Sequence, residues 1–468
     1  MIDKLSMAPA TPVNQLLHGP ILRTLVRLAI PTVVVLMMTT VLSVAETYFV
    51  SSLGTAAIAG ASLVIPVQML MTMVSNGAIG GGVASAIARA LGANRRDEAE
   101  SLAFHALVIG LGFGAVFTGV VMAFGPALYR ALGGSGEALH QALRYSNILF
   151  GASVLFCVLT LLQAALRGSG NVRVPAAIVL SSVVICFFLS PALILGWLGL
   201  PRLGVAGAGL AQVLCNAGAV VFIVLYMRSA RSNLRLRRHP LRLQPLRTIL
   251  GVGALSAIGA VQANLSIVAI TAAAGSFGVA AIAGYGIASR LEFLMIPIFF
   301  GFGSAALTII GANVGAGQIA RARRVALINA CIVAAGAEAL GILIAFFPRA
   351  WLGLFTSDPT VLAIGTQYLL RVGPVYGVIA IGTELYFAGQ GAGRVGGPVL
   401  AGTARFAIAA AGASLVVFRH GSLVHAFDFV TVAAFAFAII SAQSFRVSSW
   451  TSARTRPTSS PTHRASLS

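Results

Sequence analysis

Five carboxylic acids lie inside long apolar stretches of this 468-residue chain, where an ionised side chain is costly. They are Glu46, Glu292, Glu338, Glu384 and Asp428. A charged group at the centre of a bilayer costs roughly 3 kcal/mol even on lenient scales, and burial favours the neutral, protonated form of a carboxyl group. Such a group can bind and release a proton near neutral pH, which is the chemistry that a proton-coupled carrier requires.

Glu46 is the strongest candidate for this chemistry. It lies near the outer end of the first apolar stretch, next to Thr47 and Tyr48, whose hydroxyl groups can share hydrogen bonds with it. We interpret Glu46 as an ion-coupling carboxylate. The alternative is a structural acid that is held by a partner on another helix.

The composition requires that these acids sit in a membrane protein. Hydrophobic residues make up 58% of the chain and charged residues only 9%, and the mean hydropathy is +0.94. These values lie far from those of globular proteins, and apolar runs of about 20 residues can cross a hydrocarbon core. We predict twelve spans, at residues 24–48, 58–88, 101–126, 145–166, 174–196, 204–227, 248–273, 281–311, 325–347, 361–387, 396–418 and 423–445.

The two halves of the chain repeat each other. Three motifs of the first half return in the same order after 224, 223 and 221 residues. The pairs are Gly54-Thr-Ala-Ala-Ile-Ala-Gly60 with Gly278-Val-Ala-Ala-Ile-Ala-Gly284, Leu91-Gly-Ala-Asn94 with Val314-Gly-Ala-Gly317, and Gly168-Ser-Gly170 with Gly389-Gln-Gly391. Repeats of this length are typical of membrane transporters. Because each half has six spans, both halves enter the membrane from the same side.

We therefore predict an all-α membrane protein with twelve transmembrane helices in two six-helix lobes, related by a pseudo-twofold axis along the membrane normal. The predicted segments are a cytoplasmic N-terminal segment (1–22), an N-lobe (23–228), a basic linker (229–247), a C-lobe (248–445) and a disordered cytoplasmic tail (446–468). With the N-terminus inside, the cytoplasmic loops hold 16 basic residues and the outer loops five. The positive-inside rule supports this orientation, with both termini cytoplasmic. The net charge of +20 is assigned to these loops and not to nucleic-acid binding.

The repeat also indicates which of the remaining polar residues occupy equivalent positions in the two halves. At an offset of 224 Glu292 aligns with Gln68, and at an offset of 221 Glu384 aligns with Gln163. Polar residues at equivalent depth in both lobes suggest a substrate cavity between the lobes, with hydrogen bonding between helices as the alternative. Arg405 lies within a span and needs a partner. We predict a structural ion pair between Arg405 and either Glu384 or Asp428.

Several motifs resemble those of the multidrug and toxic compound extrusion (MATE) family of secondary antiporters. They are Ala45-Glu-Thr-Tyr-Phe-Val-Ser-Ser-Leu-Gly54, Ala88-Arg-Ala-Leu-Gly-Ala-Asn-Arg-Arg96, Leu166-Arg-Gly-Ser-Gly-Asn171, Ile310-Gly-Ala-Asn-Val-Gly-Ala-Gly317 and Gln390-Gly-Ala-Gly-Arg394. The resemblance covers the chain to about residue 418. It implies two six-helix bundles in a V and the export of cationic or amphipathic compounds in exchange for H+ or Na+.

The chain departs from the family at the implied ion site. Glu46 stands where the family usually has an Asp, and Cys186 and Ser190 stand where an Asn and an Asp often complete the site. The acid that some members carry on the seventh helix is absent, and the nearest polar residues are Gln262 and Asn264. We assign Glu46, Tyr48 and Ser190 to ion coupling. The predicted substrate cavity is lined by Gln68, Gln163, Gln262, Asn264, Glu292 and Glu384.

These observations predict a secondary antiporter of the bacterial cytoplasmic membrane that exports amphipathic, cationic small molecules as a monomer. A thiol is a poor ligand for a hard cation, so H+ is favoured over Na+ as the coupling ion. The chain has no nucleotide-binding, metal-binding or nucleophile motif, so we expect neither an enzyme nor a cofactor. The alternatives are a flippase for a lipid-linked precursor and, less well supported, a channel or a membrane sensor.

Overall fold

The computed structural model describes residues 12–418, 421–447 and 450, and all regular structure in this part of the chain is helical. The predicted tail from 446 to 468 lies outside the described residues, except for Arg446, Val447 and Trp450. The helices of the first half are α1 (Pro12–His18), α2 (Ile21–Ser51), α3 (Thr55–Thr72), η1 (Met73–Ile79), α4 (Gly80–Gly92), α5 (Arg96–Ala131), α6 (Gly136–Gly151), α7 (Ser153–Gly168), α8 (Arg173–Leu195), η2 (Trp197–Gly199) and α9 (Val205–Arg228). Those of the second half are α10 (Leu243–Gly275), α11 (Val279–Gly315), α12 (Ile319–Phe346), α13 (Pro348–Leu352), α14 (Pro359–Val372), η3 (Gly373–Val375), α15 (Tyr376–Ala392), α16 (Gly396–Phe418) and α17 (Leu423–Val447).

The described helices match the predicted membrane spans. Eleven are long and apolar enough to cross a bilayer, and the bent pair α6 and α7, with an angle of 49°, is the twelfth. The last span is a continuous helix, α17, although Asp428 lies within it. The predicted boundary between the linker and the C-lobe differs most among the segment boundaries, because α10 begins at Leu243 and not at residue 248. The linker between the halves is therefore residues 229–242.

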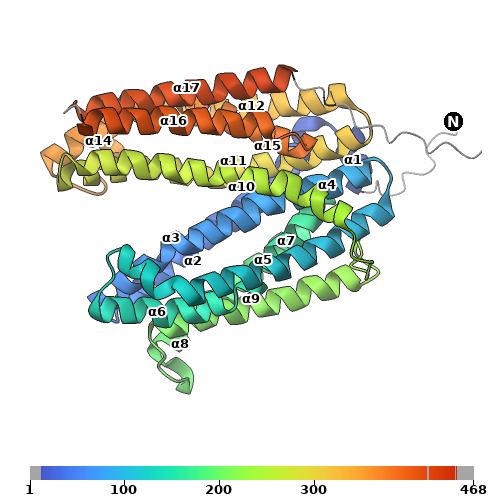
Figure 1. Ribbon diagram of the computed structural model, residues 1–468, viewed down its shortest axis with the longest axis horizontal. Helices are drawn as coiled ribbons and strands as arrows, with labels where there is room; N and C mark the ends of the chain where they lie inside the picture. The colour runs from blue at the N-terminus through green and yellow to red at the C-terminus, as the bar shows by residue number, and fades with distance from the viewer. Residues whose placement is uncertain (1–11, 419–420, 448–449, 451–468) are drawn as a thin grey trace, which may run out of the picture.

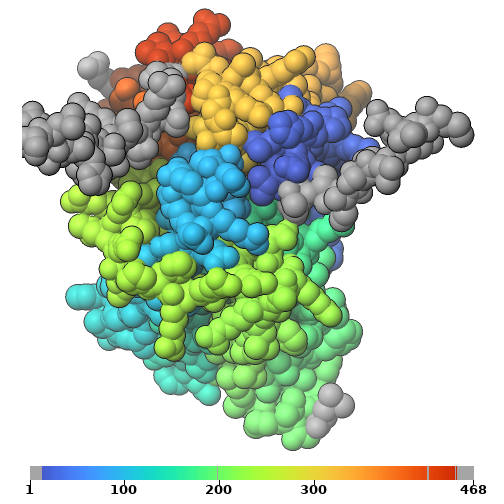
Figure 2. Space-filling view, turned by 90° about the vertical axis from the view of Figure 1, so that its right-hand side faces the viewer, coloured from blue at the N-terminus to red at the C-terminus, as the bar shows by residue number. Residues whose placement is uncertain are grey.

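The spans form two bundles (Figure 1). The first half (α2–α9, blue to green) makes the N-lobe, and the second half (α10–α17, yellow-green to red) makes the C-lobe. The lobes meet at the end where α1 and α4 lie and diverge towards the opposite end, which gives the molecule the shape of a V. Figure 2 shows the closed end, where the yellow-green linker lies across the N-lobe next to the blue turn between α4 and α5.

Reciprocal glycine contacts reveal a twofold relation between the halves. A Cβ atom on Gly92 would lie 1.9 Å from the carbonyl oxygen of Ala312, and one on Gly315 would lie 2.0 Å from that of Arg89. Both pairs of equivalent residues, Gly92 with Gly315 and Arg89 with Ala312, are 223 positions apart. Such mutual contact between equivalent residues is the mark of a twofold interface. A Cβ atom on Gly311 would meet the Ser85 carbonyl, four residues before Gly315 and Arg89 on each helix, so α4 and α11 run in the same direction, as expected for a parallel duplication.

The same geometry corrects the third motif alignment. A Cβ atom on Gly168 would meet the carbonyl oxygen of Ala84, and one on Gly391 would meet that of Leu307, at 2.5 and 2.6 Å. Both pairs of equivalents are again 223 positions apart. The sequence alignment paired Gly168 with Gly389 and is wrong by two residues. Consequently Gln163 and Glu384 are not equivalent positions.

One additional residue in the N-lobe accounts for the change of the repeat offset from 224 to 223. Gly60 and Gly284, which are 224 positions apart, make equivalent contacts with the carbonyl oxygens of Ala138 and Val361. The change to 223 occurs within the second helix of the N-lobe, which has 38 residues against 37 in α11. This helix contains the π-helical segment η1. A π-bulge is one extra residue in an α-helix, so η1 is the insertion that distinguishes the two halves.

Candidate functional site

The N-lobe holds Glu46 between α2 and α8. The Cys186 thiol donates a hydrogen bond to Glu46 Oε1 at 3.6 Å. Ser190, one turn further along α8, is fully buried and lies near Glu46, but its hydroxyl makes no hydrogen bond of standard geometry in the described part of the chain. The structure therefore brings together three residues that the sequence singled out, namely Glu46, Cys186 and Ser190.

Tyr48, which the sequence analysis assigned to ion coupling, does not take part in this cluster. It is 73% exposed, and its ring packs edge to face against Phe49. The Thr47 hydroxyl donates to the Ser43 carbonyl of its own helix. Both side chains follow Glu46 directly on α2, and adjacent helical positions point in different directions.

Sequence reasoning missed Tyr145. This tyrosine of α6 is buried and lies near Glu46. Its counterpart in the C-lobe is Tyr368, 223 positions later. The repeat offset contained this signal, because a tyrosine occurs at the same place in both halves.

The C-lobe contains a second carboxyl group in a different setting. The Tyr368 hydroxyl of α14 donates to Glu292 Oε1 of α11. The Tyr368 ring packs edge to face against Tyr285 and Phe427, with centroids 5.3 and 5.0 Å apart. Glu292 therefore binds within its own lobe, as does Gln68, whose amide donates to Gln212 on α9 at 3.2 Å.

Glu384 lies deeper than the sequence predicted. It is 1% exposed, and the buried Asn329 side chain of α12 donates to Glu384 Oε2 at 2.5 Å. This burial between α15 and α12 contradicts a position on the wall of an open cavity. Gln163 on α7 is also buried. Another acid, Glu338, accepts a hydrogen bond at 2.8 Å from the Gly377 backbone amide at the start of α15, which is a structural role.

The predicted ion pair of Arg405 is wrong. Asp428 pairs instead with Arg371 Nε at 3.0 Å, between α17 and α14. Arg405 lies over the Phe437 ring at 5.5 Å and is near Glu292. The rotation of α16 decides between these partners, and the spacing of residues along the sequence does not specify that rotation.

The closed end of the V is joined by hydrogen bonds through the π-helical segment. Gln390 Nε2 of α15 donates to the Gly77 carbonyl at 3.1 Å and to Ser256 Oγ at 3.0 Å. Arg167 Nη2 of α7 donates to Asn76 Oδ1 at 2.8 Å. Gln390 and Arg167 are equivalent residues of the two halves, 223 positions apart. Both therefore bind to the single inserted segment, one from each lobe.

Two further predicted cavity residues flank this region on α10. Asn264 donates its amide to the Met73 sulfur at the start of η1, and so contacts the other lobe. Gln262 donates to Thr403 on α16 at 2.7 Å, and its amide oxygen is buried without a partner among the described residues. Of the six predicted cavity residues, Asn264 is thus the one that the structure places at a hydrogen-bonded contact between the lobes.

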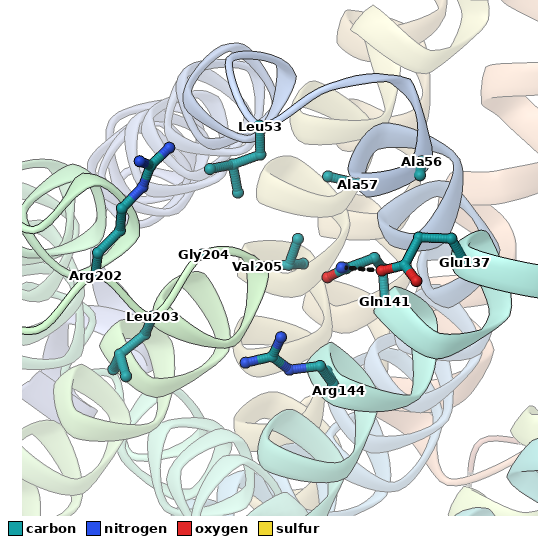
Figure 3. A pocket seen from close by; sticks show the side chains of 10 residues that line it. All are labelled: Leu53, Ala56, Ala57, Glu137, Gln141, Arg144, Arg202, Leu203, Gly204 and Val205. Atoms are coloured by element: carbon teal, nitrogen blue, oxygen red, sulfur yellow. Dashed lines mark hydrogen bonds between the residues drawn. The ribbon is translucent and has the colours of Figure 1, made fainter.

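A separate pocket of about 330 Å³ opens at the outer end of the N-lobe (Figure 3). Arg144 from α6 and Arg202 from the segment before α9 approach it from different sides, and Gln141 donates to Glu137 at 2.6 Å on its rim. The pocket also contains Leu53, which lies two turns, or about 10 Å, beyond Glu46 along the chain.

Comparisons with known proteins agree with this architecture. The MatE family model matches residues 31–192 and 256–414, one match in each half. An FAD transporter of Shewanella oneidensis is 28% identical over 371 residues, which cover 78% of this chain and 81% of the relative. A probable multidrug resistance protein, NorM, of Thermotoga maritima is 26% identical over 382 residues, with coverage of 80% and 81%. The solved structure of a MOP superfamily transporter from Pyrococcus furiosus superposes with a TM-score of 0.85 at 23% identity, and covers 95% of this chain and 98% of its own.

Proposed function

Because the chain belongs to the MatE family of transporters, we propose that it is a secondary antiporter that exports amphipathic small molecules in exchange for H+. The observation that carries this proposal is the placement of Glu46. It is the one carboxyl group of the N-lobe that lies within a predicted span, and a thiol is its hydrogen-bond donor. An apolar bundle with one such group suits a site that binds and releases a proton.

The surroundings of Glu46 favour H+ over Na+. A sodium ion prefers several oxygen ligands, whereas the neighbours of Glu46 on α8 are the Cys186 thiol and the Ser190 hydroxyl. A soft sulfur atom is a poor ligand for a hard cation. A proton needs a single carboxyl oxygen, and the thiol hydrogen bond can support the deprotonated state.

Transport then requires that the lobes alternate between two arrangements. In the described arrangement the lobes are in contact at η1, where Gln390 of the C-lobe donates to the Gly77 carbonyl at the closed end of the V. Access to that end requires that this hydrogen bond and the reciprocal contacts of Gly92 and Gly315 separate. We place this end on the cytoplasmic side, with both termini, because its loops carry most of the basic residues.

The cargo that we favour is an amphipathic cation. Anionic flavin nucleotides are a second candidate, for two reasons. The Shewanella oneidensis relative is an FAD transporter, and Glu292 and Glu384 bind partners within the C-lobe and so are not free to attract a cation in the cleft.

Proteoliposomes with separately imposed pH and Na+ gradients test both parts of the proposal. Export of a lipophilic dye cation should follow the pH gradient, persist without Na+ and stop with a protonophore. Export that follows a Na+ gradient at clamped pH would overturn the choice of coupling ion. FAD export without dye export under the same gradient would replace the cationic cargo by the flavin.

A further inference from the structure

One face of α10 is exposed along almost its whole length. Its residues are Leu243, Arg247, Leu250, Ala254, Ile258, Val261, Leu265 and Val268. The spacing of three and four residues places all of them on one side of the helix. The opposite side is buried, for example at Val252, Ser256 and Ile270. Seven of the eight residues are apolar, so this exposed face suits contact with lipid chains.

The length of the apolar part of this α10 face determines where Arg247, its one charged residue, lies relative to the membrane surface. From Leu250 to Val268 the helix rises about 27 Å, close to the ~30 Å of a hydrocarbon core. Arg247 lies on the same face, one turn beyond Leu250, and Leu243 lies one turn further. A long arginine side chain at this place reaches the level of the lipid phosphates. The exposed end of α9 is built in the same way, with Val221 and Leu225 followed by Arg228.

The linker adds charge and apolar surface at the same level. Leu241 and Leu243 are 67% and 64% exposed and flank Arg242. The chain from Arg228 to Arg247 holds seven arginines and no acid. A shallow cavity of about 440 Å³ lies at its end and is lined by Leu243, Gln244, Arg247 and Thr248.

Not all arginines at this end are available to a ligand. Arg95 pairs with Glu98 at 2.6 Å, and Arg237 pairs with Glu100 at 3.8 Å. In the described part of the chain, Arg242 and Arg247 have no acidic partner. The backbone amide of Arg242 donates to His105 Nε2 of the N-lobe at 3.0 Å, which fixes this part of the linker.

We propose that Arg242 and Arg247, with Leu241 and Leu243, form a binding site for an anionic phospholipid of the leaflet at this end of the molecule. The two guanidinium groups bind the lipid phosphate, and the leucines enter the upper part of its chains. Because the linker is fixed to the N-lobe at His105 and continues into α10 of the C-lobe, the lipid binds where the lobes are joined.

Native mass spectrometry of the full chain from nanodiscs of phosphatidylethanolamine with phosphatidylglycerol tests this site. The variant Arg242→Gln/Arg247→Gln should bind phosphatidylglycerol about thirtyfold more weakly, since each arginine near a membrane surface contributes about fivefold. The matched control is Arg95→Gln/Arg237→Gln, which removes the same charge from the same end but from arginines that are already paired with acids. It should retain the bound anionic lipid.

A second measurement uses the wild-type protein and needs no variant. Its thermal unfolding should shift to higher temperature in vesicles that contain phosphatidylglycerol, and inorganic phosphate should not reproduce the shift. If both double variants lost the same amount of phosphatidylglycerol, the binding would depend on the total positive charge at this end and not on Arg242 and Arg247. That result would overturn the proposed site. An equal shift with inorganic phosphate would assign the arginines to a free anion and also overturn it.

Discussion

The second helix of the N-lobe and that of the C-lobe have the same place in the fold but differ by one residue. In the C-lobe, α11 is a continuous α-helix, whereas in the N-lobe η1 separates α3 from α4. The insertion presents the Gly77 carbonyl to Gln390 and the Asn76 side chain to Arg167. The contact between the lobes therefore has twofold symmetry at Gly92 and Gly315 but not at η1. One lobe thus provides a hydrogen-bonding segment that the other lacks.

The acids within the spans also differ between the lobes. Glu46 lies on the first helix of its half and accepts a hydrogen bond from a thiol, whereas Glu292 lies on the second helix and accepts one from a tyrosine. The position equivalent to Glu46 in the C-lobe is the buried Ile270, 224 residues later. The two halves therefore share a scaffold, but their acids occupy positions that are not equivalent.

Deleting one residue from each second helix should break this comparison most severely. Without Gly77, η1 can return to α-helical geometry, and the flanking helices keep their orientation. Without Gly301, 224 positions later, everything beyond the deletion turns by about 100°, and the buried faces of α11 no longer match. We expect the Gly77 deletion to fold and the Gly301 deletion to aggregate.

Size-exclusion chromatography and thermal unfolding of the two purified proteins would measure this difference. Equal behaviour of the two deletions would show that η1 is not a one-residue insertion into an otherwise equivalent helix.

Glu46→Gln should abolish proton-driven export and leave the fold intact. The amide has the size of the acid but cannot release a proton. Glu46→Asp keeps the carboxyl group and should retain activity. The matching change in the other lobe, Glu292→Gln, should leave coupling to the pH gradient in place. Transport by purified, reconstituted protein is the measurement, and full export by Glu46→Gln would remove Glu46 from the mechanism.

Much of the architecture follows from the sequence, because a membrane imposes strong rules on it. Spans of about 20 apolar residues and a duplicated order of motifs are sufficient for twelve helices in two lobes. The offset failed at Gly389-Gln-Gly391, because the chain reads Gly389-Gln-Gly391-Ala-Gly393 and offers two glycine pairs in succession. Only the contact of Gly391 with Leu307 distinguishes them.

The candidate site was less predictable, since it depends on helix rotation. Hydropathy places Glu46, Glu292 and Glu384 within spans but does not say which side of a helix faces a neighbour. The turn of α16 directs Arg405 over Phe437, and so leaves Asp428 to Arg371. Likewise, hydropathy cannot detect η1, because one additional residue changes neither length nor composition noticeably.

Gln390→Leu should weaken the closed end of the V. The variant keeps the size of the side chain but removes the hydrogen bond to the half-buried Gly77 carbonyl, and such a bond contributes about 1 kcal/mol. The lobes should therefore spend more time apart at this end and closer together at the other. Distances between labels on the exposed Leu132 and Leu354, at the outer ends of the two lobes, should become shorter. Gln367→Leu, which changes an exposed glutamine in the same way, is the control and should leave the distances unchanged.

The two equivalent tyrosines give the finest test of the comparison. Tyr368→Phe removes the hydroxyl that donates to Glu292, so a half-buried carboxyl group loses a partner. We expect a loss of about 1–2 kcal/mol in the free energy of unfolding. Tyr145→Phe removes the hydroxyl at the equivalent position, but Glu46 keeps the Cys186 thiol as its donor, so the loss should be smaller. Thermal unfolding of both variants in the same detergent gives the ranking. A larger loss for Tyr145→Phe would mean that Glu46 depends on its tyrosine as Glu292 does, and the acid sites of the two lobes would then be more alike than their hydrogen bonds indicate.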